Sequence, residues 1–154
     1  AQLAVDIAED IAVGDTWSVG SYTISAAEII EFAEQFDPQP FHTDREAAKD
    51  SMFGELVASG LHTLSLSARL FVTKFVDREN GLANMGGLGM DQLRWPNPVR
   101  PGDTLTLKIE AVEKTKSESH DGRGYIEFDR TVVSNGTTAV LTYHSHNVVE
   151  RQRG

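Results

Sequence analysis

The chain has 154 residues, which is one domain's worth and enough for a single well-developed core, so residues 1–154 are treated as one domain. Its 14 basic and 23 acidic residues give a formal net charge of −9, which argues against nucleic acid or an anionic membrane as the main partner. The lack of cysteine excludes disulfides, thiolate metal sites and a cysteine nucleophile. No apolar run approaches the ~20 residues of a membrane span and no signal-peptide pattern opens the chain, so we expect a cytoplasmic protein.

The first elements are a strand and two helices. Residues 16–24 are rich in β-prone side chains and predict the first strand. Ser25 and Glu28 form a capping box that opens a helix through about residue 35. Thr43 and Glu46 fit a second capping box, which predicts a short helix over 44–51.

The longest helical pattern in the chain covers residues 61–76 and follows Ser59-Gly60. Leu66 and Leu70 widen its apolar face, so the helix is expected to be buried. The pattern predicts that one face comprises Leu61, Leu64, Ser65, Ala68, Phe71, Val72 and Phe75.

The rest of the chain reads as strand. The predicted strands cover residues 85–95, 104–116, 124–134 and 137–149. Turn residues at 77–81 end the long helix, a polar loop at 117–122 joins two strands, and Asn135-Gly136 is a strong hairpin signal between the last two. A strand, helices, one buried helix and four antiparallel strands indicate an α+β domain in which one sheet wraps one helix.

The segment 36–42 carries most of the chemistry. Asp37 and His42 can both move protons, and Pro38 and Pro40 between them predict a stiffened loop. A helix starting directly after His42 would place the imidazole beside a positive dipole end and favour its neutral form. Spacing alone leaves a second interpretation open, namely a surface loop with an Asp cap and a solvated His.

Other polar residues have plainer interpretations. His62 near the start of the long helix is expected to be structural, and Asp44 is explained as the first residue of the capped helix. His144 and His146 should share one face of the last strand, where a partly exposed surface explains them better than a metal does, since no third ligand is near in sequence. The candidates for contacts with anionic phosphates are Arg69, Arg94 and Arg100, and a position on the solvated surface explains them equally well.

Three motifs together carry a family resemblance. They are Asp-x-x-Pro-x-His at 37–42, Val-Ala-Ser-Gly at 57–60 and Leu-Arg-Trp-Pro-Asn-Pro-Val-Arg-Pro-Gly-Asp-Thr at 93–104. From about residue 14 to 149 the chain resembles the MaoC-like (R)-specific enoyl-CoA hydratases. Phe36 and Gln39 depart from the family's usual Gly-Asp-x-Asn-Pro form, and we expect them to change substrate range and not reaction type.

The resemblance implies a hot-dog fold, in which a curled five-stranded sheet encloses a long central helix, and a homodimer or higher assembly. It implies that Asp37 and His42 are the catalytic pair, with no metal and no redox cofactor. The expected oxyanion and substrate-binding residues are Gly60, Ser59, Gln39 and Phe41. Gly60 could instead simply ease the turn into the helix.

The implied function is addition of water to a trans-2-enoyl-CoA, or to an acyl-carrier thioester, giving the (R)-3-hydroxyacyl thioester. One alternative is a hot-dog acyl-CoA thioesterase. Many such enzymes use an Asp or Glu on the central helix or nearby, and residues 61–76 contain no carboxylate, which counts against this alternative. The other alternative is a non-catalytic acyl-CoA-binding module, which would not require Asp37 and His42.

Overall fold

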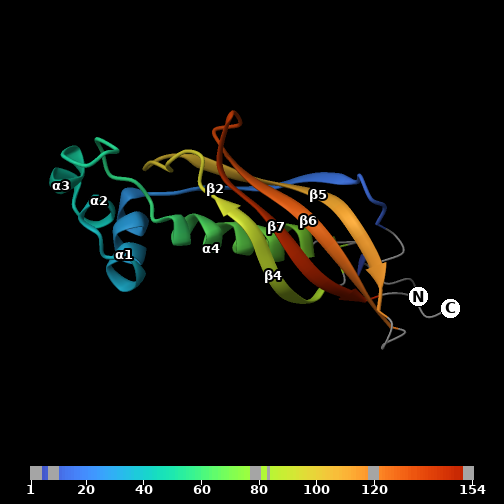
Figure 1. The fold of residues 1–154 in the computed structure, drawn as a ribbon. Coiled ribbons are helices and arrows are strands. Elements are labelled where there is room, and N and C mark those ends of the chain that lie inside the picture. The colour runs from blue at the N-terminus through green and yellow to red at the C-terminus, as the bar shows by residue number, and fades with distance from the viewer. Residues whose placement is uncertain (1–4, 7–10, 77–80, 83, 118–121, 151–154) are drawn as a thin grey trace.

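The fold is one curled antiparallel sheet wrapped around one long helix (Figure 1). The structure, a computed structural model, describes residues 5–6, 11–76, 81–82, 84–117 and 122–150. The sheet has five strands in the order β2-β5-β6-β7-β4. In chain order they are β2 (Thr16–Thr23), β4 (Asn84–Arg94), β5 (Thr104–Lys116), β6 (Arg123–Ser134) and β7 (Thr138–Glu150).

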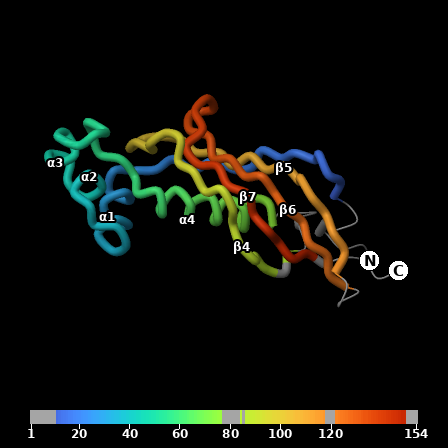
Figure 2. Tube along the Cα trace, viewed as in Figure 1, coloured from blue at the N-terminus to red at the C-terminus, as the bar shows by residue number. Residues whose placement is uncertain are grey.

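The helices are α1 (Ala26–Phe36), α2 (Pro40–Thr43), α3 (Arg45–Lys49) and α4 (Gly60–Leu70), which continues as a π-helix over Phe71–Val76. The first three helices lie together beyond the N-terminal end of α4, and α4 itself runs along the inside of the sheet (Figure 2). A short parallel pair, β1 (Val5–Asp6) and β3 (Gly81–Leu82), was not expected from the sequence. This arrangement is the hot-dog fold, so the expected fold class is confirmed.

Alternation along the strands explains why the sheet curls around a helix. On β5, Leu105, Leu107 and Ile109 are buried and their neighbours are not, and the same alternation continues along β6 and β7. Inward side chains therefore form a mostly apolar face that needs one cover, with Arg130, Ser145 and Asn147 as buried polar exceptions. The helical residues that cover it include Leu66, Leu70, Phe71 and Phe75, all buried.

The predicted buried face of the long helix is partly wrong. His62, Thr63 and Ser67 are buried, whereas Leu61 and Val72 are 47% and 45% exposed. The polar Ser67 is accommodated because its hydroxyl lies 2.6 Å from the Tyr143 hydroxyl, which satisfies both groups. Apolar residues surround most of this helix, so periodicity could not single out the face that meets the sheet.

Local signals placed most boundaries correctly. The capping box is present, with the Ser25 hydroxyl accepting from the Glu28 N–H and the Glu28 carboxylate accepting from the Ser25 N–H. Asn135 and Gly136 have φ of 52° and 75°, the paired positive values that a two-residue hairpin turn requires. Much of the loop predicted at 117–122 and of the turn predicted at 77–81 lies outside the described residues. Among the described helices, none combines the length and apolar character needed to cross a membrane.

Two glycines with positive φ allow a matched test of how β2 packs on the helix. Gly20 (φ +67°) interrupts β2, and a Cβ there would lie 2.8 Å from Leu70 Cδ2 and from Lys74 Cγ, whereas a Cβ at Gly136 (φ +75°) would meet nothing within 4 Å. Gly136→Ala should cost about 1–2 kcal/mol from backbone strain alone. Gly20→Ala should cost ~1–3 kcal/mol more, because it also overpacks the buried Leu70. Urea unfolding of both variants measures the difference, and equal losses would contradict close packing of β2 on the helix.

Candidate active site

Asp37 ends α1 and faces into the site. Its N–H donates to the Ala33 carbonyl at 2.8 Å, so it caps the C-terminus of α1. Pro38 follows and cannot continue the helix. The Asp37 side chain is 21% exposed, which leaves its carboxylate accessible but largely surrounded by protein.

His42 lies on α2, not in a loop, so the prediction of a non-helical segment up to His42 is wrong. Gln39 is the N-cap of α2 and Pro40 is its first residue, where the missing N–H of proline costs no helical hydrogen bond. The capping box predicted at Thr43 is also absent, because Asp44 caps α3 by accepting from the Glu46 and Ala47 N–H groups. His42 therefore lies in the last turn of α2, and the helix that follows it in sequence, α3, begins only at Arg45.

A different contact fixes the form of the imidazole. His42 Nδ1 is 2.7 Å from the Val57 carbonyl oxygen, which can only accept, so Nδ1 carries a proton. In the neutral ring, Nε2 is then left with a lone pair, and it lies 3.4 Å from Asp37 Oδ2. The ring is buried, so it is oriented by the protein and not by solvent.

The Asp37 carboxylate is held in its ionised form. Ser59 Oγ donates to Oδ2 at 2.7 Å and Gln39 Nε2 donates to Oδ1 at 2.8 Å. Partial burial raises the pKa of Asp37, but these two hydrogen bonds and the nearby His42 outweigh it, so the pKa lies below its ordinary value. Asp37 is consequently an acceptor of protons and hydrogen bonds at neutral pH.

Ser59 and Gly60 start α4 next to this pair. Ser59 is the N-cap, its hydroxyl accepting from the Leu61 N–H at 3.2 Å while donating to Asp37. Gly60 is the first helical residue, whose N–H has no partner within the helix. Trp95 explains why this position is glycine, since a Cβ at Gly60 would lie 2.6 Å from the Trp95 ring. Trp95 Nε1 also donates to the Gly60 carbonyl at 2.9 Å.

These groups line one cleft of about 680 Å³, a volume in the range of small-molecule sites. Its walls combine a few polar groups with apolar and aromatic side chains. The lining residues used below are Asp37, Gln39, Phe41, His42, Phe53, Gly60, Trp95 and Arg100.

The sequence-predicted residues fall into two groups. The structure brings Asp37, Gln39, Phe41, His42 and Gly60 into the cleft and places Ser59 directly behind Asp37. The neighbour Phe36 is 63% exposed, contacts Phe32 and is not part of the cleft lining. The proposed effect of Phe36 on substrate range therefore has no structural support.

The remaining candidates are mostly structural. His62 stacks on Phe32 with centroids 4.4 Å apart, and burial lowers its pKa. Of the three arginines, Arg100 lines the cleft and donates to Glu55 at 2.8 Å, while Arg69 lies 6.0 Å from the Tyr22 ring. The contact of His42 with the Val57 carbonyl and that of Asp37 with the Ser59 hydroxyl could not be predicted from the sequence, because neither has a local signal.

The sequence matches one known family over most of its length. The model of the family described as MaoC like domain matches residues 12–135. The chain belongs to this family. The MaoC-like domain is 38% identical to a MaoC-like dehydratase from Rhodospirillum rubrum, with a TM-score of 0.83 over 95% of this chain and 97% of that one.

Two further relatives extend the comparison. The domain is 37% identical over 108 residues to Protein MaoC of Klebsiella aerogenes, covering 70% of this chain but only 31% of that longer protein. R-hydratase PhaJ1 from Pseudomonas aeruginosa shares the fold, with a TM-score of 0.73 at 22% identity over 95% of this chain and 86% of that one. The resemblance that the three sequence motifs suggested is confirmed.

Replacing Ser59 tests how Asp37 is kept ionised. Ser59→Ala removes the 2.7 Å hydrogen bond to Oδ2 but leaves the carboxylate partly buried, so the pKa of Asp37 should rise. A depressed carboxyl pKa stabilises the fold above the unfolded-state pKa, and this contribution is lost as the pH falls through the folded-state value. The stability deficit of the variant should therefore be larger at about pH 7 than at about pH 3.

Carboxyl ¹³C NMR titration of Asp37 and urea unfolding at both pH values measure these effects. Ser65→Ala is the matched control, because the Ser65 hydroxyl donates only to the Leu61 carbonyl of its own helix. If both variants showed the same Asp37 pKa, Ser59 would not support the carboxylate.

Proposed function

We propose that this MaoC-like domain is a hydratase/dehydratase that adds water to a trans-2-enoyl thioester of coenzyme A or an acyl-carrier protein, giving the (R)-3-hydroxyacyl thioester. The observation that carries the proposal is the 3.4 Å approach of His42 Nε2 to Asp37 Oδ2 at the wall of the cleft. Membership of the MaoC-like family supports the reaction class.

Asp37 and His42 can handle every proton of the reaction from one side of the substrate. A water bound between Oδ2 and Nε2 gives up one proton to the pair as its oxygen bonds to Cβ. The pair then delivers a proton to Cα, so that one O–H bond and the π bond between Cα and Cβ break while one C–O and one C–H bond form. Both groups lie on the same wall of the cleft, which favours addition to a single face. Such acid–base catalysis typically contributes ~10²–10⁴ in rate.

The start of α4 would stabilise charge on the thioester oxygen. The Gly60 N–H has no intrahelical partner and lies at the positive end of the helix dipole. An oxyanion donor of this kind is typically worth ~10²–10³ in rate.

The walls of the cleft suggest how the rest of the substrate binds. Phe41, Phe53 and Trp95 offer apolar surface for the acyl chain. Arg100 is half exposed at the same cleft, and its contact with Glu55 is an exposed pair that a phosphate group could replace. No metal or redox cofactor takes part in the proposed steps.

The thioesterase alternative would need a carboxylate elsewhere. Within α4 and the π-helix that follows it, no residue is acidic. Incubation with an enoyl-CoA separates the two activities, since a hydratase removes the conjugated double bond while a thioesterase releases free thiol.

The pair itself is tested by single and double substitutions. Asp37→Asn and His42→Ala should each lower kcat by at least ~10², because either change leaves the shared water unactivated. The double variant should be hardly worse than the slower single one, since groups acting as a unit are strongly non-additive. Hydration kinetics with short-chain and medium-chain enoyl-CoAs measure these effects.

The control for these variants is Asp44→Asn, because Asp44 only caps α3 and asparagine is an equally good cap. Thermal melts must accompany the kinetics, since His42 is buried and bonded to Val57, so His42→Ala should also cost about 1 kcal/mol of stability. Simple multiplication of the two single effects would mean independent roles and would eliminate the shared-water mechanism.

We also propose that the domain forms a homodimer through β4. This strand is at one edge of the sheet, and its Leu88 and Met90 are 63% and 50% exposed. Together with the exposed Val72 they line one hollow beside the helix. An apolar edge strand of this kind is a ready site for pairing with a second copy.

Leu88→Asp tests the dimer, because a charge at this edge should prevent pairing and leave a folded monomer. Sedimentation velocity at micromolar concentration should show a dimer for the wild type and a monomer for the variant. Val13→Asp, which changes another exposed apolar residue far from β4 in sequence, should remain dimeric. A monomeric wild type would contradict the proposal.

A further inference from the structure

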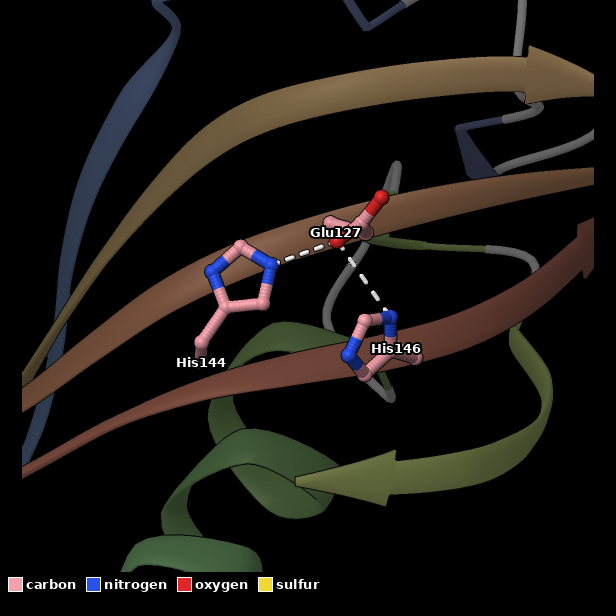
Figure 3. A group of neighbouring side chains, drawn as sticks. All are labelled: Glu127, His144 and His146. Atoms are coloured by element: carbon pink, nitrogen blue, oxygen red, sulfur yellow. Dashed lines mark hydrogen bonds and ion pairs between the residues drawn. The ribbon is translucent and has the colours of Figure 1, made fainter. Parts of the chain in front are cut away.

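Two histidines and a glutamate meet on the outer face of the sheet, on neighbouring strands. Glu127 on β6 is the cross-strand partner of His146 on β7, and Asp129 is the partner of His144. His144 and His146 are two residues apart and share a face, on which all three side chains turn toward one another (Figure 3). The sequence indicated the two histidines but no third ligand. Glu127 is far from them in sequence and becomes their neighbour only when β6 pairs with β7 in the observed register.

The three groups converge through one atom each. Glu127 Oε1 lies 2.5 Å from His144 Nε2 and 3.3 Å from His146 Nδ1, and the three ligand atoms are all within 4.8 Å of one another. In a tetrahedral site with metal–ligand bonds of about 2.0–2.1 Å, neighbouring ligand atoms are about 3.3 Å apart. Shifts of about 1 Å in these partly exposed side chains would therefore reach metal-binding geometry.

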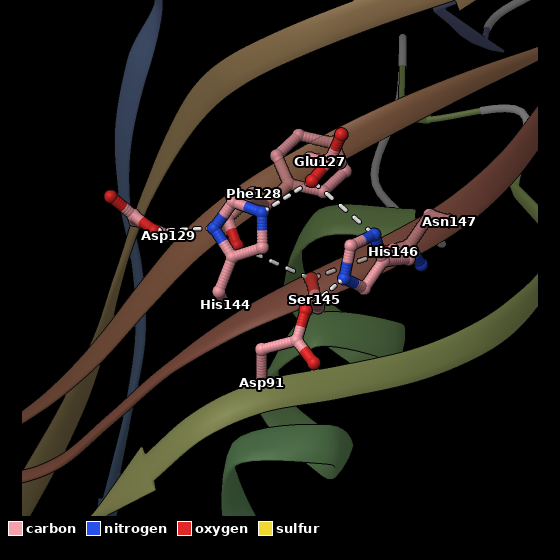
Figure 4. Close-up of polar contacts among 8 residues, drawn as sticks. All are labelled: Asp91, Glu127, Phe128, Asp129, His144, Ser145, His146 and Asn147. Atoms are coloured by element: carbon pink, nitrogen blue, oxygen red, sulfur yellow. Dashed lines mark hydrogen bonds and ion pairs between the residues drawn. The ribbon is translucent and has the colours of Figure 1, made fainter.

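The far nitrogen of each imidazole is already held by a carboxylate. His144 Nδ1 lies 2.9 Å from Asp129 Oδ1, and His146 Nε2 lies 2.5 Å from Asp91 Oδ2, which comes from β4 (Figure 4). Histidines that bind metals almost always donate their second N–H to such a partner, which orients the ring and makes the ligating nitrogen more basic. The outer layer that a metal site requires is thus in place for both rings.

On these grounds we infer that Glu127, His144 and His146 form a binding site for a divalent transition-metal ion of the zinc type. Two imidazoles and one carboxylate suit zinc, cobalt or nickel, whereas magnesium and calcium prefer oxygen ligands throughout. Three protein ligands leave a fourth position for water, as in zinc sites that are open to solvent.

The surrounding charge favours a cation. The carboxylates that face the two histidines are Glu113 on β5, Glu127 and Asp129 on β6, and Asp91 on β4. Glu113 is the cross-strand partner of Glu127, so two of these carboxylates lie side by side. A divalent ion would relieve this repulsion.

The site is separate from the cleft. The neighbours Ser145 and Asn147 are buried, so the side chains of His144 and His146 lie on the opposite, partly exposed face of β7. Neither histidine is part of the cleft lining, and the proposed hydration needs no metal. Metal binding and hydratase activity can therefore succeed or fail independently.

The test is zinc titration of the untagged protein by calorimetry near neutral pH. The wild type should bind one equivalent of Zn²⁺ and should not bind Mg²⁺, and its Tm should rise with zinc. His144→Gln and Glu127→Gln should each weaken zinc binding at least about 100-fold, and Asp129→Asn about 10-fold as a loss of the outer layer. Because metal ions compete with protons for these ligands, binding should also weaken when the pH is lowered to about 5.5.

His62→Gln is the matched control, because His62 is a buried histidine of α4 that stacks on Phe32 and should not affect zinc affinity. Melting curves without zinc confirm that each variant is folded, and Glu127→Gln keeps the shape of the side chain if His144→Gln proves unstable. Failure of the wild type to bind zinc at micromolar concentration would overturn the inference. Equal affinity in the wild type and in both ligand variants would do the same.

Discussion

The active site depends on one buried segment, Leu56–Ser59, which joins α3 to α4. All four residues are nearly inaccessible to solvent. The Val57 carbonyl fixes the His42 tautomer, and the Ser59 hydroxyl fixes the Asp37 carboxylate while it caps α4. The two proton-carrying groups therefore take their positions from backbone and side-chain atoms only two residues apart, which explains how they are aligned with each other.

The same segment ties the two sides of the cleft together. The Val57 N–H donates to the Phe41 carbonyl on α2, and the Ala58 N–H donates to the Val99 carbonyl in the loop after β4. That loop begins with Trp95, whose indole closes over Gly60. Movement of either wall would therefore disturb the start of α4 and the orientation of His42 at once. Such rigidity favours catalysis, because Asp37, His42 and the Gly60 N–H must keep fixed positions relative to one another.

Sequence patterns predicted those parts of the structure that local chemistry determines. The bounds of β5, the Ser25 capping box and the Asn135-Gly136 turn depend on neighbours in sequence, and all three are observed. The pairing of Asp37 with His42 was expected from the family resemblance, because their spacing alone also allowed a surface loop. The prolines led to the incorrect prediction of a loop, because a proline such as Pro40 is tolerated at the first position of a helix as readily as in a loop. The buried face of α4 and the burial of His42 depend on long-range contacts, so no local pattern could supply them.

The contacts of strand β7 explain why the group of Glu127, His144 and His146 could not be predicted, and they also show what sets the register of this strand. Inward residues there are polar as well, since Arg130 on β6 donates to the Tyr143 hydroxyl and to Asn147 Oδ1. A strand that is polar on both faces has a weak hydrophobic signal for its register, and a slip of one residue would exchange the two faces. The buried arginine contacts on one side and the His144 pairing on the other both penalise such a slip. Polar and charged contacts thus fix the register of this hairpin, as alternating apolar residues do on β5. The same register places two imidazoles opposite a carboxylate.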